Sequence, residues 1–206
     1  FVIGEEISSG GNGTVYLATI GKRKFIYKLE RMDVYDKKKP LESEYYRQLK
    51  FDKDISQKHP NKFLTIKDHG IIKNCDYVHP KTEEFLDVCS KRGNENRIRR
   101  FKRKNSQPDC YYLLCSPFLD GTFPSIRGKI LGNHDLFLDF MYQIIDSLNI
   151  VRKAGYSQND MGPNNIMYKK KDGEDKYQWY IIDYGNMYNK DFPTSALDRD
   201  IQDRQK

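Results

Sequence analysis

The clearest pattern in the sequence is a helical stripe of apolar residues between residues 135 and 154. Apolar side chains recur there every three or four residues and so fall on one face of a helix: Leu136, Phe137, Phe140, Met141, Ile144, Ile145, Leu148 and Val151. Asp135 can cap the start of this helix, and Gly155 stands where a left-handed C-terminal cap is expected. The helix is therefore expected to bury one face against other elements.

The first third of the chain has a different pattern, that of β-strands. Short β-branched or aromatic runs alternate with turns, which predicts an antiparallel meander and two further strands: residues 1–7, 14–20, 24–29, 63–72 and 111–115. A helix is expected over residues 40–51, and two apolar strands, 165–168 and 179–182, follow the long helix. The pattern favours an α+β fold whose N-terminal lobe contains five strands and one helix.

The composition fits a globular protein with a highly charged surface. Hydrophobic residues make up 37% and charged residues 32% of 206 residues, enough for one core or two small lobes around a cleft. Because there is no run of about 18 apolar residues and no targeting pattern, we expect no membrane span and a cytoplasmic or nuclear location, in a host cell if the source is a virus. Reduced structural thiols are expected at all four cysteines, Cys75, Cys89, Cys110 and Cys115.

The net charge of +7 is concentrated in residues 91–104. This segment holds eight basic residues and one acid, Glu95, so eight minus one accounts for the whole +7. It lies in an expected insertion, about residues 77–109, between two strands. A solvated loop is the simpler interpretation, and a docking loop for nucleic acid, anionic lipid or an acidic protein is the alternative.

A glycine-rich turn joins the first two strands. Small residues let the backbone close over a triphosphate and point N–H groups at its oxygens: Ser8, Ser9, Gly10, Gly11, Asn12, Gly13 and Val15. Lys28, near the end of the next strand, lies thirteen residues past Val15, where the kinase pattern has the lysine that holds the α- and β-phosphates of ATP. Two carboxylates on the following helix, Glu42 and Glu44, are plausible partners for that lysine.

The strongest functional pattern follows the long helix. Asp160 and Asn165 share one loop, and Asp183 comes at the end of a later apolar strand. Their spacing matches the kinase catalytic loop H-R-D-x-x-x-x-N followed by a metal-binding aspartate. Asp160 would orient a hydroxyl and accept its proton, and oxygen atoms of Asn165 and Asp183 would bind Mg²⁺.

Three segments together resemble the casein kinase 1 and vaccinia-related group of protein kinases: residues 7–18, residues 143–148, and Asp183-Tyr184-Gly185 in place of D-F-G. The string 42–46 also resembles the E-S-K-x-Y of casein kinase 1 enzymes, which favours Glu42 as the partner of Lys28. The resemblance covers roughly residues 1–190. It implies a bilobal kinase fold, ATP and Mg²⁺ as cofactors, and serine or threonine residues of proteins as substrates.

The resemblance also implies a division of the chain. Residues 1–115 would form the N-terminal lobe, residues 116–121 the hinge, and residues 122–206 a reduced or truncated, mainly helical C-terminal lobe. Backbone groups of the hinge would meet the adenine, and the residues expected to do so are Ser116, Phe118 and Leu119.

Three positions depart from the kinase pattern. Gln158 and Asn159 replace the catalytic-loop histidine and arginine, and Gly162 replaces a lysine that neutralises the γ-phosphate. The lost charge favours an alternative function, a nucleotide-binding pseudokinase or scaffold with a basic docking loop. Since D-x-x-P-x-N, here residues 160–165, also occurs in aminoglycoside-type kinases, a small-molecule phosphotransferase is a third hypothesis.

Overall fold

The computed structural model of the chain forms two compact units. The first comprises residues 1–37 and 67–115, and the second comprises residues 38–66 and 116–206. The residues that the structure describes are 1–9, 13–32, 43–73, 75, 109–157, 160–171, 176–185 and 187–189. The basic segment 91–104 lies outside the described residues. Glu42, the carboxylate expected to pair with Lys28, also lies outside them.

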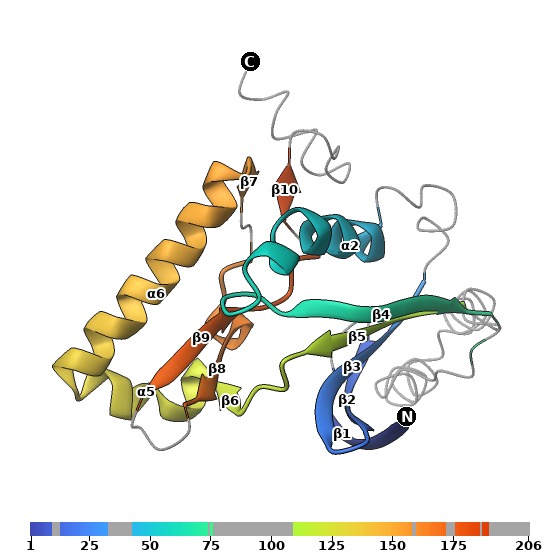
Figure 1. Cartoon of the computed structure of the whole chain (residues 1–206), viewed down its shortest axis with the longest axis horizontal. Helices are drawn as coiled ribbons and strands as arrows, with labels where there is room; N and C mark the ends of the chain where they lie inside the picture. Colours follow the sequence, from blue (N-terminus) through green and yellow to red (C-terminus); the bar gives the residue numbers. More distant parts are fainter. Residues whose placement is uncertain are drawn as a thin grey trace, which may run out of the picture. The chain divides into compact units, whose positions relative to one another are not determined.

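A five-stranded sheet makes up most of the first unit, with the strand order β1-β2-β3-β5-β4 (Figure 1). Its strands are β1 (Val2–Ser9), β2 (Gly13–Ile20), β3 (Arg23–Arg31), β4 (Thr65–Ile72) and β5 (Cys110–Ser116). The meander β1-β2-β3 is antiparallel, and β5 pairs with β3 in the same sense. The five strands predicted from the sequence, and the α+β class, are confirmed.

Tyrosine rings pack on one face of this sheet. Ala18, Tyr27 and Leu114 are buried, and the ring of Tyr27 stacks on that of Tyr112 with 5.6 Å between centroids. Burial and the nearby phenols of Tyr112 and Tyr16 raise the pKa of Tyr27 above its ordinary value. The first unit thus has a small core that relies on few fully buried side chains.

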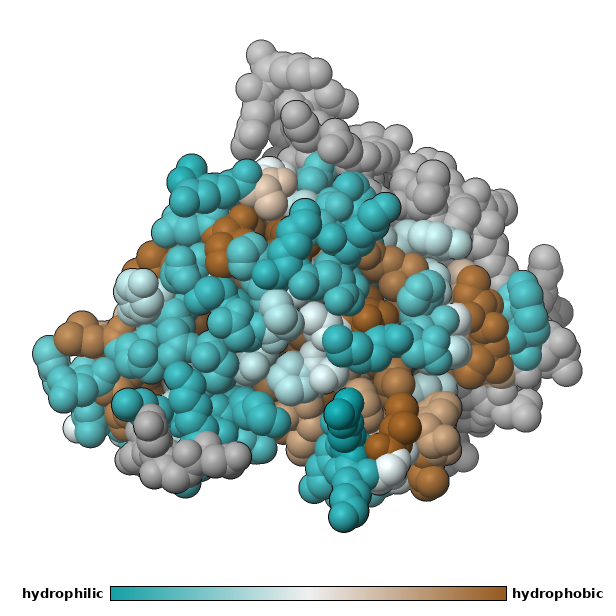
Figure 2. All heavy atoms as spheres, viewed as in Figure 1, coloured by the Kyte–Doolittle hydropathy of each residue, from teal (hydrophilic) through white to brown (hydrophobic). Residues whose placement is uncertain are grey.

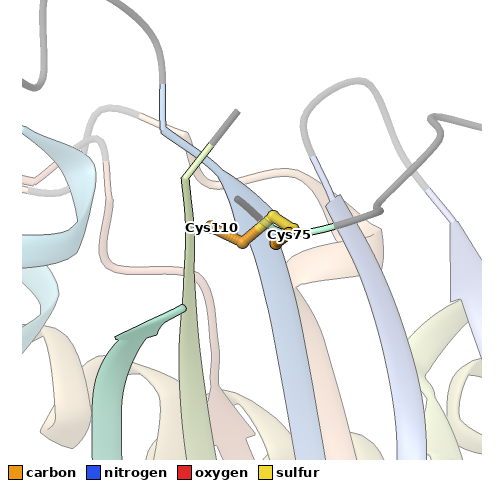
Figure 3. Close-up of a disulfide and its surroundings, with 2 residues drawn as sticks. All are labelled: Cys75 and Cys110. Atoms are coloured by element: carbon orange, nitrogen blue, oxygen red, sulfur yellow. A yellow bond between two sulfur atoms is a disulfide. The ribbon is translucent and has the colours of Figure 1, made fainter. Parts of the chain in front are cut away.

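A disulfide links Cys75 to Cys110 (Figure 3). Cys75 follows the end of β4 and Cys110 begins β5, and because these two strands are neighbours in the sheet, their Cα atoms lie 5.9 Å apart. That separation is typical of disulfides. The expectation of reduced thiols is therefore wrong for this pair. Cys115 is a free, buried cysteine, and Cys89 lies outside the described residues.

The second unit contains the helices. They are α2 (Glu44–Asp54), α5 (Phe123–Leu131) and α6 (His134–Lys153), with the short 3-10 helices η2 (Ser56–Lys58) and η3 (Pro163–Asn165). Two small sheets accompany them: β6 (Gly121–Thr122) with β8 (Ile166–Lys170) and β9 (Tyr177–Ile181), and β7 (Tyr156–Ser157) with β10 (Tyr188–Asn189). The antiparallel pairing of β8 with β9 confirms the predicted hairpin.

The long helix α6 forms where the sequence predicts it. It differs from the prediction in the residue that caps its start and in the residues that it buries. Asn133, not Asp135, caps its start, because the Asn133 side chain accepts hydrogen bonds from the N–H groups of Asp135 and Leu136 at 3.1 Å. Gly155 has φ of 78°, the left-handed conformation expected there. Met141 and Ile145, which the predicted stripe includes, are exposed, while the polar Gln143 is buried.

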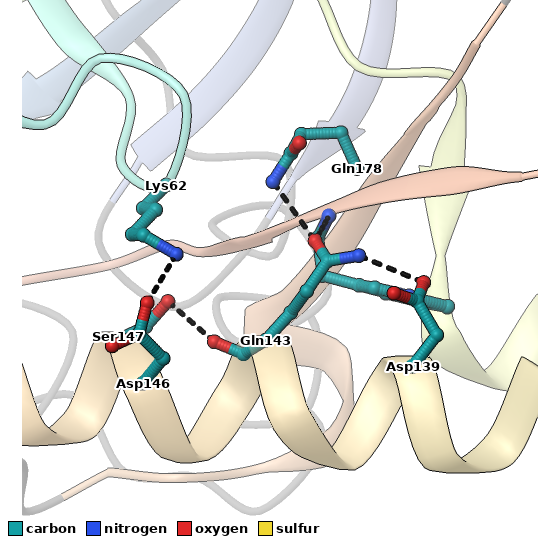
Figure 4. A network of polar contacts seen from close by, with 7 residues as sticks. Lys62, Asp139, Gln143, Asp146, Ser147 and Gln178 are labelled. Atoms are coloured by element: carbon teal, nitrogen blue, oxygen red, sulfur yellow. Dashed lines mark hydrogen bonds and ion pairs between the residues drawn. The ribbon is translucent and has the colours of Figure 1, made fainter.

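Gln143 explains this shift of the buried face (Figure 4). Its amide nitrogen donates to Asp139 Oδ2 at 2.8 Å and to the Tyr177 carbonyl at 3.0 Å. Its amide oxygen accepts from Trp179 N at 3.1 Å and from Gln178 Nε2 at 2.8 Å. Because these bonds satisfy the amide, a buried glutamine can join α6 to β9 without the cost of an unpaired polar group.

An aromatic core holds the second unit together. Its buried members come from α2, α5, α6, β8, β9 and the segments next to them: Phe51, Ile55, Phe63, Ile130, Phe140, Ile144, Val151, Tyr156, Ile166, Tyr177, Trp179, Ile181, Tyr184 and Met187. Phe51 of α2 is fully buried and contacts the rings of Phe63, Tyr156 and Tyr184. This packing places α2 with residues of the second unit, whereas the sequence-based division grouped this region with the five strands.

Hydrophilic residues cover most of the described surface on the face drawn in Figure 2, and hydrophobic residues reach it in separate groups. Across the part of the chain that the structure describes, no helix combines the length and apolar character needed to cross a membrane.

Candidate functional site

Lys28 lies in the middle of the sheet of the first unit. In the register of β3 it stands opposite Val15 of β2 and Leu113 of β5. Its ammonium forms an ion pair with the carboxylate of Glu30, two residues along the same strand and therefore on the same face. The Glu30 side chain is only 5% exposed, against 20% for Lys28. The two charges thus depend on each other, because a buried carboxylate without a cation is strongly destabilising.

The pairing of Lys28 with Glu30 was not predicted from the sequence. The predicted partner was Glu42 on the following helix, which lies outside the described residues. The alternation of side chains along a strand was the available signal, since Lys28 and Glu30 share one face.

The start of β2 approaches Glu30 closely. A Cβ atom placed on Gly13 would lie 2.4 Å from Glu30 Cγ and 2.6 Å from the Leu29 carbonyl oxygen, so no other residue fits without a shift. On the other side of the turn, Ser8 pairs with Val15 and Ser9 with Thr14 in the β1–β2 ladder. Of the predicted phosphate-binding turn, Gly10, Gly11 and Asn12 lie outside the described residues.

Asp160, Asn165 and Asp183 lie in the second unit and are joined through Asn165. The Asn165 amide nitrogen donates to the Asp160 carbonyl at 3.0 Å. The Asn165 carbonyl accepts from Ile182 N at 2.9 Å, directly before Asp183. Asn165 therefore connects the loop that contains Asp160 to Ile182, which follows β9 and precedes Asp183.

Asp183 has an unusual backbone conformation. Its φ of 61° is the one positive φ among the described residues other than glycine. The left-handed region costs an L-residue about 1–2 kcal/mol, less for aspartate than for bulkier residues. Such a conformation persists where the surroundings fix it, and it is common at functional sites.

Glu44, the other carboxylate proposed as a partner of Lys28, lies next to the segment that contains Asp183 and Gly185. It begins α2 directly after the N-cap Ser43, whose hydroxyl accepts from Tyr46 N at 3.3 Å. Gln48 Nε2 donates to Glu44 Oε1 at 3.1 Å, and the Glu44 side chain fills the space where a Cβ of Gly185 would stand. Glu44 therefore packs against the Asp183-Tyr184-Gly185 segment, within the second unit.

A partly buried contact connects α2 to β7, the strand before Asp160. Tyr156 of β7 donates its hydroxyl to Asp54 Oδ2 at 2.6 Å, and Lys50 Nζ contacts the same oxygen at 2.6 Å. Burial raises the pKa of Asp54, but the hydrogen bonds from Lys50 and Tyr156 outweigh this effect and hold the pKa below its ordinary value.

The predicted hinge residues make backbone contacts within the second unit. The Ser116 carbonyl accepts from the Thr65 hydroxyl at 3.2 Å, and the Phe118 carbonyl accepts from Lys169 Nζ at 3.3 Å. Leu119 is buried, and Asp120 N donates to the Tyr168 carbonyl at 2.9 Å. The adenine-binding role assigned to this segment stays a prediction.

Asp183 and Asn165 are the residues expected to bind Mg²⁺. The described residues contain no cluster of three or more histidine, cysteine, aspartate or glutamate side chains that could bind a metal alone. Carboxylate and amide oxygens are ligands that Mg²⁺ takes, together with water and phosphate oxygens. A metal-binding role for these two residues stays a prediction.

The comparisons with known proteins point to kinases. No family model matches the chain. A protein of Acanthamoeba polyphaga mimivirus named "Putative serine/threonine-protein kinase L232" is 24% identical over 132 residues. The match covers 63% of this chain and 18% of that relative, so the chain corresponds to less than a fifth of its length. The similarity indicates a distant, kinase-like relationship.

Proposed function

We propose that this chain binds Mg-ATP and transfers its γ-phosphate to serine or threonine hydroxyl groups of proteins, as a member of the casein kinase 1 and vaccinia-related group. The observation that carries the proposal is the pair of hydrogen bonds through Asn165, which connect the Asp160 loop to the residue before Asp183. These bonds hold Asn165 next to the loop of Asp160 and next to Ile182, which precedes Asp183, and the three residues follow one another in the order of the kinase pattern.

Each residue has one task in this reaction. Asp160 orients the substrate hydroxyl and accepts its proton, while the oxygen atoms of Asn165 and Asp183 hold Mg²⁺. Bound Mg²⁺ supplies the positive charge that stabilises the phosphate oxygens during transfer. Lys28, which forms an ion pair with Glu30, holds the α- and β-phosphates.

The test is transfer of radiolabelled phosphate from ATP to casein and to the chain itself. Asp160→Asn is the informative variant, because Asp160 is exposed and the change keeps its size while removing the base. Loss of a general base lowers the rate by about 100-fold or more. Equal transfer by the variant and the wild type would contradict the proposal. Lys28→Ala is a poorer test, because it also removes an ion pair to the buried carboxylate of Glu30 and so changes stability as well as phosphate binding.

Gly162 favours the second candidate function, a pseudokinase that binds nucleotide without transfer. The backbone there has φ of −76°, which any residue adopts, and no atom lies within 4 Å of an added Cβ. Nothing in the described structure therefore demands glycine, and a lysine fits at this position.

Gly162→Lys separates the two functions, with Gly162→Ala as the control for backbone effects. If the chain is a kinase limited by the missing charge, the lysine variant should transfer phosphate about tenfold faster, since one positioned cation stabilises the transition state. Stabilisation of the wild type by Mg-ATP with no transfer by any variant would select the pseudokinase.

A further inference from the structure

The hydroxyl of Tyr184 makes two hydrogen bonds that a phenylalanine would lack. It accepts from the backbone N–H of Leu64 at 3.0 Å, and it donates to the backbone carbonyl of Ile181. All three residues are buried, with Tyr184 at 6%, Leu64 at 9% and Ile181 at 0% exposure. Water therefore cannot easily replace the hydroxyl at either backbone group.

The ring of Tyr184 is fixed as firmly as its hydroxyl. It stacks on Phe51 of α2 with 4.1 Å between ring centroids and an interplanar angle of 23°. The ring of Phe63 meets it edge-on at 6.1 Å. Since α2 and the segment before β4 each supply one ring, Tyr184 cannot turn without breaking contacts to both.

The backbone of Asp183 and Gly185, the residues on either side of Tyr184, has to be held in place by its surroundings. Asp183 holds a left-handed φ of 61°, which its surroundings must stabilise. Gly185 lies against the side chain of Glu44, where even a Cβ would approach within 2.4 Å of three Glu44 atoms. The segment 183–185 is thus defined by a strained backbone, a double hydrogen bond and a close packing contact in succession.

We infer that the Tyr184 hydroxyl is a clamp that positions Asp183 for metal binding. Its bond to Ile181 spans the residues on either side of Asp183, and its bond to Leu64 attaches this stretch to the segment before β4, so that Asp183 meets Mg²⁺ in one preset orientation. Tyr184 touches neither substrate nor metal, and it acts as a positioning residue. The inference rests on the proposed metal-binding role of Asp183.

Tyr184→Phe in the full chain tests the clamp, because it removes the hydroxyl and keeps the ring that packs on Phe51. Tyr180→Phe is the matched control, since Tyr180 is a second buried tyrosine near the same strand end. The first measurement is the Mg²⁺ concentration that gives half-maximal binding of a fluorescent ATP analogue. We expect Tyr184→Phe to raise it by about fivefold to tenfold, because the segment that carries Asp183 loses both hydrogen bonds of the hydroxyl. Tyr180→Phe should change it less than about twofold.

The second measurement is hydrogen exchange of the Leu64 amide, which does not depend on any nucleotide. The amide should exchange at least about tenfold faster in Tyr184→Phe than in the wild type or in Tyr180→Phe. Equal exchange in all three proteins would overturn the clamp. If Tyr184→Phe does not fold, exchange in the wild type decides: an amide as fast as an exposed one contradicts the clamp, and a protected one supports it.

The two hypotheses fail in distinguishable ways. Nucleotide binding without phosphate transfer would overturn the kinase function, while the Mg²⁺ dependence would still test the clamp. Transfer by the wild type with the same Mg²⁺ dependence in Tyr184→Phe would overturn the clamp and leave the kinase function standing.

Discussion

The meander of the first unit and the candidate site of the second unit are stabilised by contacts of different range. The meander β1-β2-β3 pairs residues that are close in sequence, from Gly13 with Glu30 to Ile20 with Arg23. At the candidate site, the hydrogen bonds Leu64–Tyr184 and Asp54–Tyr156 join residues 120 and 102 positions apart. The difference teaches that the meander follows from local pattern, whereas the candidate site depends on contacts that the sequence does not display.

Truncation of Phe51 in the second unit should give the largest loss in the free energy of unfolding. Phe51→Ala leaves a cavity among three aromatic rings and should lower the free energy of unfolding by about 3–5 kcal/mol. Tyr27→Ala in the first unit should cost less, about 2 kcal/mol, because the rings next to Tyr27, those of Phe1, Tyr16 and Tyr112, are exposed or only partly buried and water can reach the gap. Urea unfolding measures both, and a larger cost for Tyr27→Ala would break the comparison.

Reduction of the disulfide should come next, and it concerns the first unit. Breaking the Cys75–Cys110 bond, which closes a loop with a sequence separation of 35, should lower the free energy of unfolding by about 2–4 kcal/mol. Unfolding with and without dithiothreitol measures the effect. The double variant Cys75→Ser, Cys110→Ser is the control, since its stability should not respond to the reductant.

Removal of the buried amide of Gln143 should have a somewhat smaller effect. Gln143→Ala leaves the Trp179 N–H and the Tyr177 carbonyl without their partner, at a cost of about 2–3 kcal/mol. Gln57→Ala is a matched control, because Gln57 also donates two hydrogen bonds but is exposed, so water replaces it. Equal losses in the two variants would show that burial does not set the value of these bonds.

The smallest expected effect is a dependence of stability on acid pH. The folded pKa of Asp54 is below the ordinary 3.8. The ion therefore contributes stability that is present above pH 3.8 and is lost as the pH falls through the lower folded pKa. Because the Asp54 side chain is 32% exposed, we expect less than about 1 kcal/mol.

Tyr156→Phe should reduce this acid dependence, because it removes one of the hydrogen bonds that lower the pKa of Asp54. Thermal unfolding between pH 2 and pH 5 (roughly the range in which carboxyl groups titrate) compares the two proteins. An identical pH dependence would show that the Tyr156 contact does not act on Asp54.

The sequence predicts elements with a strong periodic pattern and misses those defined by their neighbours. The five strands, α6 and the β8–β9 hairpin are confirmed because period-2 and helical patterns arise within each element. The helix α5 was missed because it buries only Ile130 and contains Gly128. The disulfide was missed because the proximity of Cys75 and Cys110 exists only once β4 and β5 lie side by side.

The candidate site divides in the same way. The sequence names Asp160, Asn165 and Asp183; in the structure Asn165 bonds to the Asp160 carbonyl and to the N–H of Ile182, the residue before Asp183. It does not reveal that Tyr184 reaches the backbone of Leu64, because a tyrosine in that position has the same periodicity as any aromatic residue. Whether Lys28 serves the same nucleotide stays a prediction.

The bond between Cys75 and Cys110 closes residues 76–109 into a covalent ring. A protease that cuts one peptide bond inside this ring therefore leaves the two fragments linked to each other. Only a reductant separates them, so such a cut would be visible on a denaturing gel with dithiothreitol and hidden without it.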